Sequence, residues 1–65
     1  MVKMTTKRQR GPHGEVLYNL WEQKELVGTI GYWQGTLYVQ PHMDPRMVER
    51  KVIKHFPSLP YTLVL

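Results

Sequence analysis

The sequence predicts a small α+β domain: a three-stranded antiparallel meander, one α-helix packed on one of its faces, and a short C-terminal strand, in the order β-β-β-α-β. Three observations support this fold class. Residues 15–40 are rich in aromatic and β-branched side chains and are interrupted twice by short polar turns. Residues 43–57 place apolar side chains at helical spacing, and residues 61–65, YTLVL, again favour a strand.

Residues 1–14 are expected to form a flexible basic tail ahead of a single small domain at residues 15–65. The cations of this tail are Lys3, Lys7, Arg8 and Arg10. They lie among Thr, Gln and Gly with no apolar periodicity, which is typical of a disordered segment. The segment also lacks the apolar stretch of a secretory signal, which favours a cytoplasmic location.

Three runs of residues have the composition and length of antiparallel strands. EVLYNLWE (15–22) and ELVGTIGYW (25–33) are separated by Gln23-Lys24, and TLYVQ (36–40) follows Gln34-Gly35. Two-residue connections between such runs predict tight hairpins, and Gly35 accepts the positive φ that these turns need.

Strand periodicity assigns the side chains of this meander to two faces. With two-residue turns, the face expected to contact the helix is nearly all apolar and contains Leu17, Asn19, Trp21, Leu26, Gly28, Ile30, Tyr32, Leu37 and Val39. The opposite face mixes polar residues with Val16, Tyr18, Leu20, Val27, Trp33 and Tyr38. A shift of one residue in the pairing would mix the two sets, which supports this register.

Residues 43–57, MDPRMVERKVIKHFP, form the clearest predicted helix. Asp44 is a favourable N-cap, Pro45 suits the first turn, and Pro57 cannot continue the helix. At about 100° per residue, the apolar stripe expected to pack on the sheet is Val48, Val52 and Phe56, flanked by Ile53. The cationic row expected to face solvent is Arg46, Arg50 and Lys54, with Lys51 nearby.

The sequence alone does not decide which strand pairs with the last strand, YTLVL. If the helix runs back along the sheet, this strand is parallel to the strand at residues 15–22. A right-handed crossover then places it beside that strand, in the order 4-1-2-3. One alternative is a small SH3-like barrel, and another is that the last strand pairs with a second protomer to form a dimer.

The distribution of charge favours an anionic partner, because the net charge is +4. The tail could follow a phosphate backbone or enter a minor groove, and the helix row could contact phosphates. The expected nucleic-acid contacts are Lys7, Arg8, Arg10, Arg46, Arg50, Lys51 and Lys54. We expect a non-enzymatic nucleic-acid-binding protein, chiefly DNA-binding, with an accessory or regulatory role of the type that phages, plasmids and mobile elements encode.

Three aromatic residues, Tyr18, Trp33 and Tyr38, support an alternative function. In the expected register they share the sheet face turned away from the helix. They could stack on unpaired bases at about 1–3 kcal/mol per base, or form the centre of a protein interface. Apolar neighbours on the same face favour a covered or protein-contacting patch. The alternative is therefore a protein-interaction module, an inhibitor or a self-associating dimer, that uses this face or an edge strand.

No pattern in the sequence indicates an enzyme, a cofactor, a small-molecule substrate or a metal site. His13, His42 and His55 do not have the spacing of metal ligands. The glycines of GTIGYWQG lie within expected strands, not between a strand and a helix where phosphate-binding loops occur. No apolar run approaches the ~18 residues of a membrane span.

The order of elements over residues 7–56, a basic arm followed by a three-stranded sheet and a helix, is similar to that of the arm-binding domains of phage integrases. The resemblance implies DNA binding with the sheet laid in the major groove. This chain departs from that pattern because the outward sheet face lacks Arg and Lys and a strand follows the helix. The basic arm and the helix row are therefore the better contact candidates.

Overall fold

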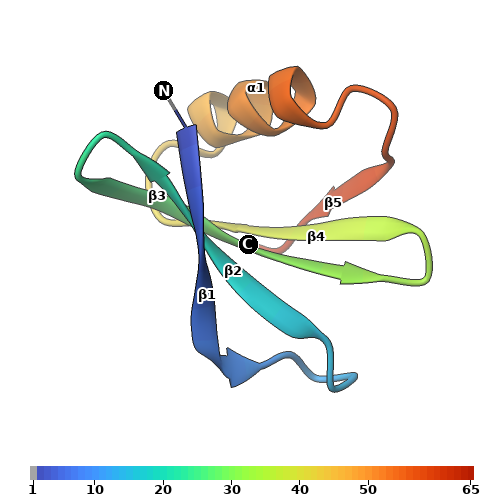
Figure 1. Ribbon diagram of the computed structural model, residues 1–65. Helices are drawn as coiled ribbons and strands as arrows, with labels where there is room; N and C mark the ends of the chain where they lie inside the picture. Colours follow the sequence, from blue (N-terminus) through green and yellow to red (C-terminus); the bar gives the residue numbers. More distant parts are fainter. Residues whose placement is uncertain (1) are drawn as a thin grey trace.

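The computed structural model describes residues 2–65 and shows an open five-stranded sheet with one helix across one face (Figure 1). The elements are β1 (Val2–Arg10), β2 (Val16–Glu22), β3 (Glu25–Trp33), β4 (Thr36–Pro41), α1 (Pro45–His55) and β5 (Tyr61–Leu63). The strands follow the order β1-β2-β3-β4-β5; the first four form an antiparallel meander, and β5 is parallel to β4. The predicted α+β class is confirmed.

The meander has four strands, not three, because residues 2–10 form β1 instead of a tail. β1 pairs antiparallel with β2 from Val2 opposite Glu22 to Arg10 opposite Val16, with an irregularity between Thr6 and Arg10. Without β1, the backbone groups along one side of β2 would have no strand partner. Charged residues are common on edge strands, where they discourage pairing with other chains, so composition alone did not separate this strand from a tail.

The last strand has the expected direction but a different neighbour. β5 pairs with β4, from Leu37 opposite Tyr61 to Val39 opposite Leu63, and not with the strand at residues 16–22. That strand already has β1 on one side and β3 on the other. The order 4-1-2-3 and the barrel are both wrong, because α1 returns the chain to the free edge of β4 and the sheet stays open between β1 and β5.

An irregularity in the pairing of β2 with β3 changes which face of β2 meets the helix. Leu20 is opposite Gly28 but Trp21 is opposite Leu26, so Val27 is an extra residue on β3. Such a bulge reverses the face of one strand relative to the other. Leu20, and not Leu17, Asn19 and Trp21, is therefore on the helix side, where it is 1% exposed.

The core lies between α1 and the sheet. Its buried apolar side chains are Leu20, Val27, Ile30, Leu37, Val39, Val48 and Val52. Val48 and Val52 of the predicted helix stripe are 0% exposed and Phe56 packs against the cluster, which confirms these three positions. Ile53, expected to flank the stripe, is instead 45% exposed. The Asp44 side chain caps the helix by accepting from the Arg46 N–H at 3.0 Å.

Both hairpin turns have the expected two residues. Gln23 and Gln34 have φ of 57° and 48°, and Gly35 has φ of 80°. The left-handed conformation is unusual for Gln and natural for Gly, so each turn holds at least one residue in a costly conformation.

Within residues 2–65, no helix is long and apolar enough to cross a membrane.

Candidate nucleic-acid interface

The outer face of α1 carries three exposed cations, Arg46, Arg50 and Lys54. They point away from the sheet because Val48 and Val52, on the opposite side of the helix, are buried in the core. Arg50 Nε lies 3.4 Å from the Arg46 carbonyl oxygen, to which it donates. Within residues 2–65, the recorded ion pairs do not involve any of these three side chains. They are therefore open to an external anion.

Lys51 is engaged differently from the other helix cations. Its Nζ donates to Glu22 Oε1 at 3.1 Å and so joins α1 to the end of β2. This hydrogen bond lowers the pKa of Glu22. Partial desolvation acts in the opposite direction, and the positive charge of Lys51 lowers the pKa further. Of the four predicted helix contacts, Lys51 is therefore the one whose charge is already used inside the fold.

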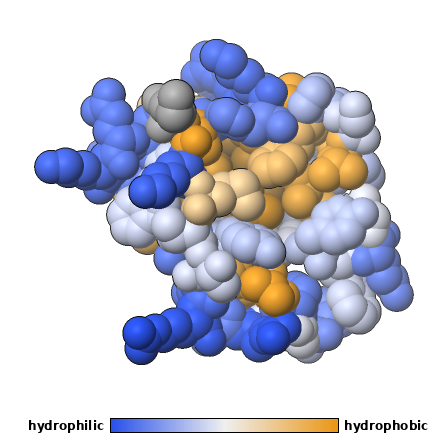
Figure 2. All heavy atoms as spheres, viewed as in Figure 1, coloured by the Kyte–Doolittle hydropathy of each residue, from blue (hydrophilic) through white to orange (hydrophobic). Residues whose placement is uncertain are grey.

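Two shallow hollows lie beside this helix face and share two lysines. One, of about 250 Å³, is lined by Met47, Arg50, Lys51 and Lys54. The other, of about 350 Å³, lies toward the start of β1 and is lined by Val2, Glu22, Lys51, Lys54 and His55. Figure 2 shows hydrophilic side chains gathered over α1 at the top of the view. The helix thus presents a cationic strip, and the first of these recesses, whose lining within residues 2–65 has no carboxylate, is wide enough for a single anionic group.

The β1 cations lie apart from this strip. Lys7, Arg8 and Arg10 are at the C-terminal end of β1, which Figure 1 shows at the bottom of the sheet, away from α1 at the top. Arg10 Nη1 also donates to the Gly14 carbonyl oxygen at 3.1 Å, which fixes it to the following loop. The structure does not bring the two predicted basic groups together on one surface, and the expected free arm is an ordered strand.

The three predicted partner-contact aromatics do not share a face. Tyr18 is opposite Ile30 and lies on the helix side, whereas Trp33 and Tyr38 lie on the other side of the sheet. The bulge at Val27 is the physical reason. His13 stacks on Trp33, with ring centroids 4.7 Å apart and an interplanar angle of 7°. The patch predicted from Tyr18, Trp33 and Tyr38 is therefore divided, and Trp33 has a partner within the chain.

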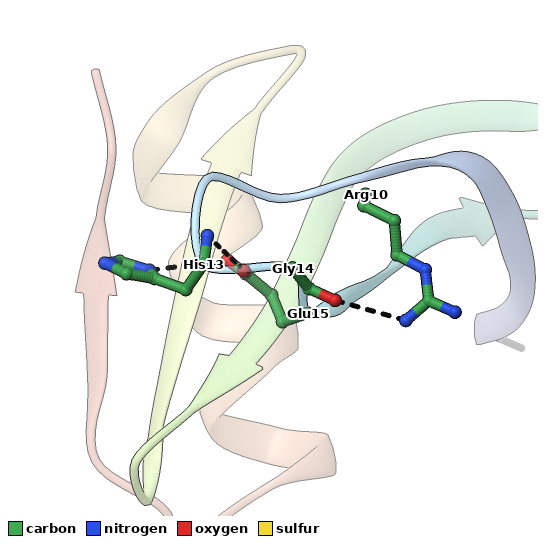
Figure 3. Close-up of polar contacts among 4 residues, drawn as sticks. All are labelled: Arg10, His13, Gly14 and Glu15. Atoms are coloured by element: carbon green, nitrogen blue, oxygen red, sulfur yellow. Dashed lines mark hydrogen bonds and ion pairs between the residues drawn. The ribbon is translucent and has the colours of Figure 1, made fainter.

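The loop between β1 and β2 contains functional candidates that sequence reasoning missed. The Glu15 side chain is 6% exposed. Figure 3 shows His13 and Glu15 turned toward each other: Glu15 Oε1 accepts the His13 backbone N–H at 2.8 Å, and Oε2 lies 3.9 Å from His13 Nδ1. The available signal was the spacing of Gly11 and Gly14 immediately before an acidic residue, which is typical of a tight loop.

A cavity of about 170 Å³ lies between this loop and the sheet, on the face opposite α1. Its lining residues are Pro12, His13, Glu15, Leu17, Thr29, Gly31, Tyr38, Gln40 and Val64. Thr29 Oγ1 is 2.9 Å from His42 Nε2, so this hydroxyl already has a partner. The cavity has apolar walls and a carboxylate among its polar groups.

The described part of the chain contains no cluster of three or more His, Asp or Glu side chains that could hold a metal ion. The features with recognition chemistry include Arg and Lys on α1, the separate cations of β1, and a buried carboxylate on the far side of the sheet. No protein-family model, no curated protein and no solved structure matches this chain.

Proposed function

We propose that this protein binds nucleic acid, in the first place duplex DNA, through phosphate contacts on the outer face of α1. The observation that supports this proposal is the row of three exposed cations that no recorded ion pair within residues 2–65 neutralises. The row is held on a helix that the core fixes from the other side, so its side chains need little backbone ordering on binding.

The size of the row sets the expected strength of binding. Arg46 and Lys54 are eight residues apart, which is about 12 Å along a helix. Each DNA strand places a phosphate about every 3.4 Å along the axis, so the row spans about three phosphates. Neutralising about three phosphates gives a slope near −3 for log K against log salt concentration. Contacts of this kind carry no sequence information, so binding is expected to be largely independent of sequence.

The test compares two double variants that remove the same charge from different places. Arg50→Gln with Lys54→Gln removes two cations from α1, and Lys7→Gln with Arg8→Gln removes two from β1. We expect the helix variant to reduce the salt slope by about 2, measured by fluorescence anisotropy with a labelled 20-base-pair duplex. The same titration with single-stranded DNA and with RNA determines which polymer binds most tightly.

If the salt slope of the helix variant equals that of the parent protein, the proposal is contradicted. Equal loss in both double variants would also count against the helix face, since it would show a response to net charge alone. Circular dichroism of each variant verifies that the fold is retained.

The second candidate function is a protein-interaction module, an inhibitor or a self-associating dimer. The open outer edges of β1 and β5 favour it, because unpaired strand edges accept an additional strand. We rank it second because the aromatic patch on which it was based is divided between two faces. Light scattering over a range of protein and salt concentrations examines this alternative. Self-association that salt leaves unchanged supports it, and a monomer at all concentrations argues against a self-associating dimer.

A further inference from the structure

Glu15 is a carboxylate with unusual surroundings for a protein of net charge +4. Its side chain is 6% exposed, and Oε1 accepts a hydrogen bond from the His13 backbone N–H. An ionised carboxylate has about four acceptor sites, so further acceptor capacity remains. A carboxylate withdrawn from water gains most from a cation with N–H donors, since the attraction is strongest where solvent is excluded.

The cavity beside Glu15 offers space for such a cation. Its volume of about 170 Å³ is close to that of an apolar cavity that accommodates benzene, so a group of about five or six heavy atoms fits. Leu17 and Pro12 supply apolar walls, Tyr38 supplies an aromatic ring, and Gln40 supplies a further acceptor. Aromatic rings attract organic cations through their faces.

The cationic groups already near Glu15 leave this space open. His13 Nδ1 is 3.9 Å from Oε2, beyond a good hydrogen bond, and its ring is stacked on Trp33. Arg10 donates to the Gly14 carbonyl oxygen on the other side of the loop, as Figure 3 shows, and it does not line the cavity. Glu15 is the acidic residue among those that line it.

We propose that this cavity binds one guanidinium or alkylammonium group, with Glu15 as its counter-ion and Tyr38 and Leu17 packing against its carbon atoms. The same chemistry can come from a free organic cation or from an Arg or Lys side chain of another polypeptide. The site lies on the sheet face opposite α1, so it does not depend on the proposed nucleic-acid binding.

The experiment titrates the protein with small probes and follows backbone amide chemical shifts by NMR. The probes are N-methylguanidine, n-butylamine, the peptide acetyl-Gly-Arg-Gly-amide, and the neutral isostere N-methylurea. We expect at least one of the first three to shift the amides of His13, Tyr38 and Gln40 with saturation, and N-methylurea to bind at least about tenfold more weakly. Binding of the peptide assigns the site to a side chain; binding of the free cations alone assigns it to a small molecule. Equal responses to N-methylguanidine and N-methylurea would overturn the proposal.

Three variants test the position of the site. Glu15→Gln keeps an acceptor for the His13 N–H but removes the charge, and we expect it to weaken cation binding about tenfold or more. Val64→Phe places a ring at the rim of the cavity and leaves Glu15 in place, and we expect it to block binding as well. Glu25→Gln makes the same charge change at the exposed start of β3 and should leave the affinity unchanged. Unchanged affinity in both Glu15→Gln and Val64→Phe, or no saturable shift with any cation, would refute the site.

Discussion

Glu15 organises the loop between β1 and β2 because its side chain lies against the loop and the sheet and not in solvent. The Gly11 N–H donates to the Glu15 carbonyl oxygen at 2.9 Å, and the Gly14 N–H donates to the Gly11 carbonyl oxygen at 3.0 Å. The carboxylate accepts the His13 N–H at 2.8 Å, which holds the histidine ring over Trp33. A few local hydrogen bonds therefore place the loop on the sheet and create the cavity below it.

Replacement of Gly11 by Ala should disturb this loop. A Cβ at residue 11 would overlap the Glu15 carboxylate, so the carboxylate must shift, and we expect this shift to weaken the hydrogen bond from the His13 N–H. We expect Gly11→Ala to lower the free energy of unfolding by about 1–2 kcal/mol, measured by urea denaturation. In a Glu15→Ala background the overlap is absent, so Gly11→Ala should then have a smaller effect. Additive effects of the two changes would contradict the assignment.

At the scale of the elements, α1 is joined to both halves of the sheet by polar contacts around the core. Lys51 donates to Glu22 at the end of β2, and the Tyr61 hydroxyl of β5 donates to Glu49 Oε2 at 2.6 Å. The second contact holds the short strand β5 beneath the helix. It also raises the pKa of Tyr61, because the hydrogen bond to Glu49 favours the neutral phenol and burial adds to this preference.

The raised pKa of Tyr61 makes one contribution to stability dependent on alkaline pH. The usual tyrosine pKa is 10.0, and the folded state holds the proton more tightly than the unfolded state. The contribution is therefore complete below about pH 10 and is lost as pH rises through the higher pKa of the folded protein. Tyr61→Phe should lower the melting temperature by a few degrees at pH 7–9, and this difference should shrink above about pH 10.

Differential scanning calorimetry across that pH range measures the effect of Tyr61→Phe. Tyr32→Phe is the control, because Tyr32 is 50% exposed and no recorded hydrogen bond within residues 2–65 involves its hydroxyl. A difference between Tyr61→Phe and the parent protein that stays the same at all pH values would argue against the Glu49 contact.

At the scale of the whole molecule, a small core supports a surface with two separate chemical characters. Cations on α1 face one side, and the buried carboxylate of Glu15 faces the cavity on the other side of the sheet. The buried apolar cluster is limited to a few side chains, so each of them carries a large share of a stability that is expected to be small for 65 residues.

A single truncation in this core should therefore unfold a large fraction of the protein on mild heating. Val52→Ala removes two buried methyl groups and leaves a cavity, so we expect a loss of about 2–3 kcal/mol and a melting temperature lower by roughly 10–20 °C. Ile53→Ala, at the 45% exposed neighbouring position, should cost less than half of this. Similar losses in the two variants by thermal circular dichroism would show that α1 does not pack as described.

Local patterns in the sequence determined the elements whose signals lie within a few residues. Asp44, Pro45 and Pro57 bounded α1, the helix period separated Val48 and Val52 from Arg46, Arg50 and Lys54, and the two polar pairs at residues 23–24 and 34–35 fixed both hairpin turns. These features depend on caps, side-chain spacing and turn conformation, all of which short-range physics decides.

Tertiary structure alone decided the features that depend on pairing between distant segments. The edge strand β1, the bulge at Val27, the position of β5 and the buried side chain of Glu15 each result from competition among backbone hydrogen bonds and packing surfaces across the whole sheet. The composition of a charged edge strand is the same as that of a flexible tail, so the two differ only once the neighbouring strand is known. A bulge of one residue moves the side chains of a strand to the other face of the sheet, and nothing in the local sequence shows where the bulge occurs. For this reason the cationic helix face could be predicted from the sequence, whereas the Glu15 cavity could not.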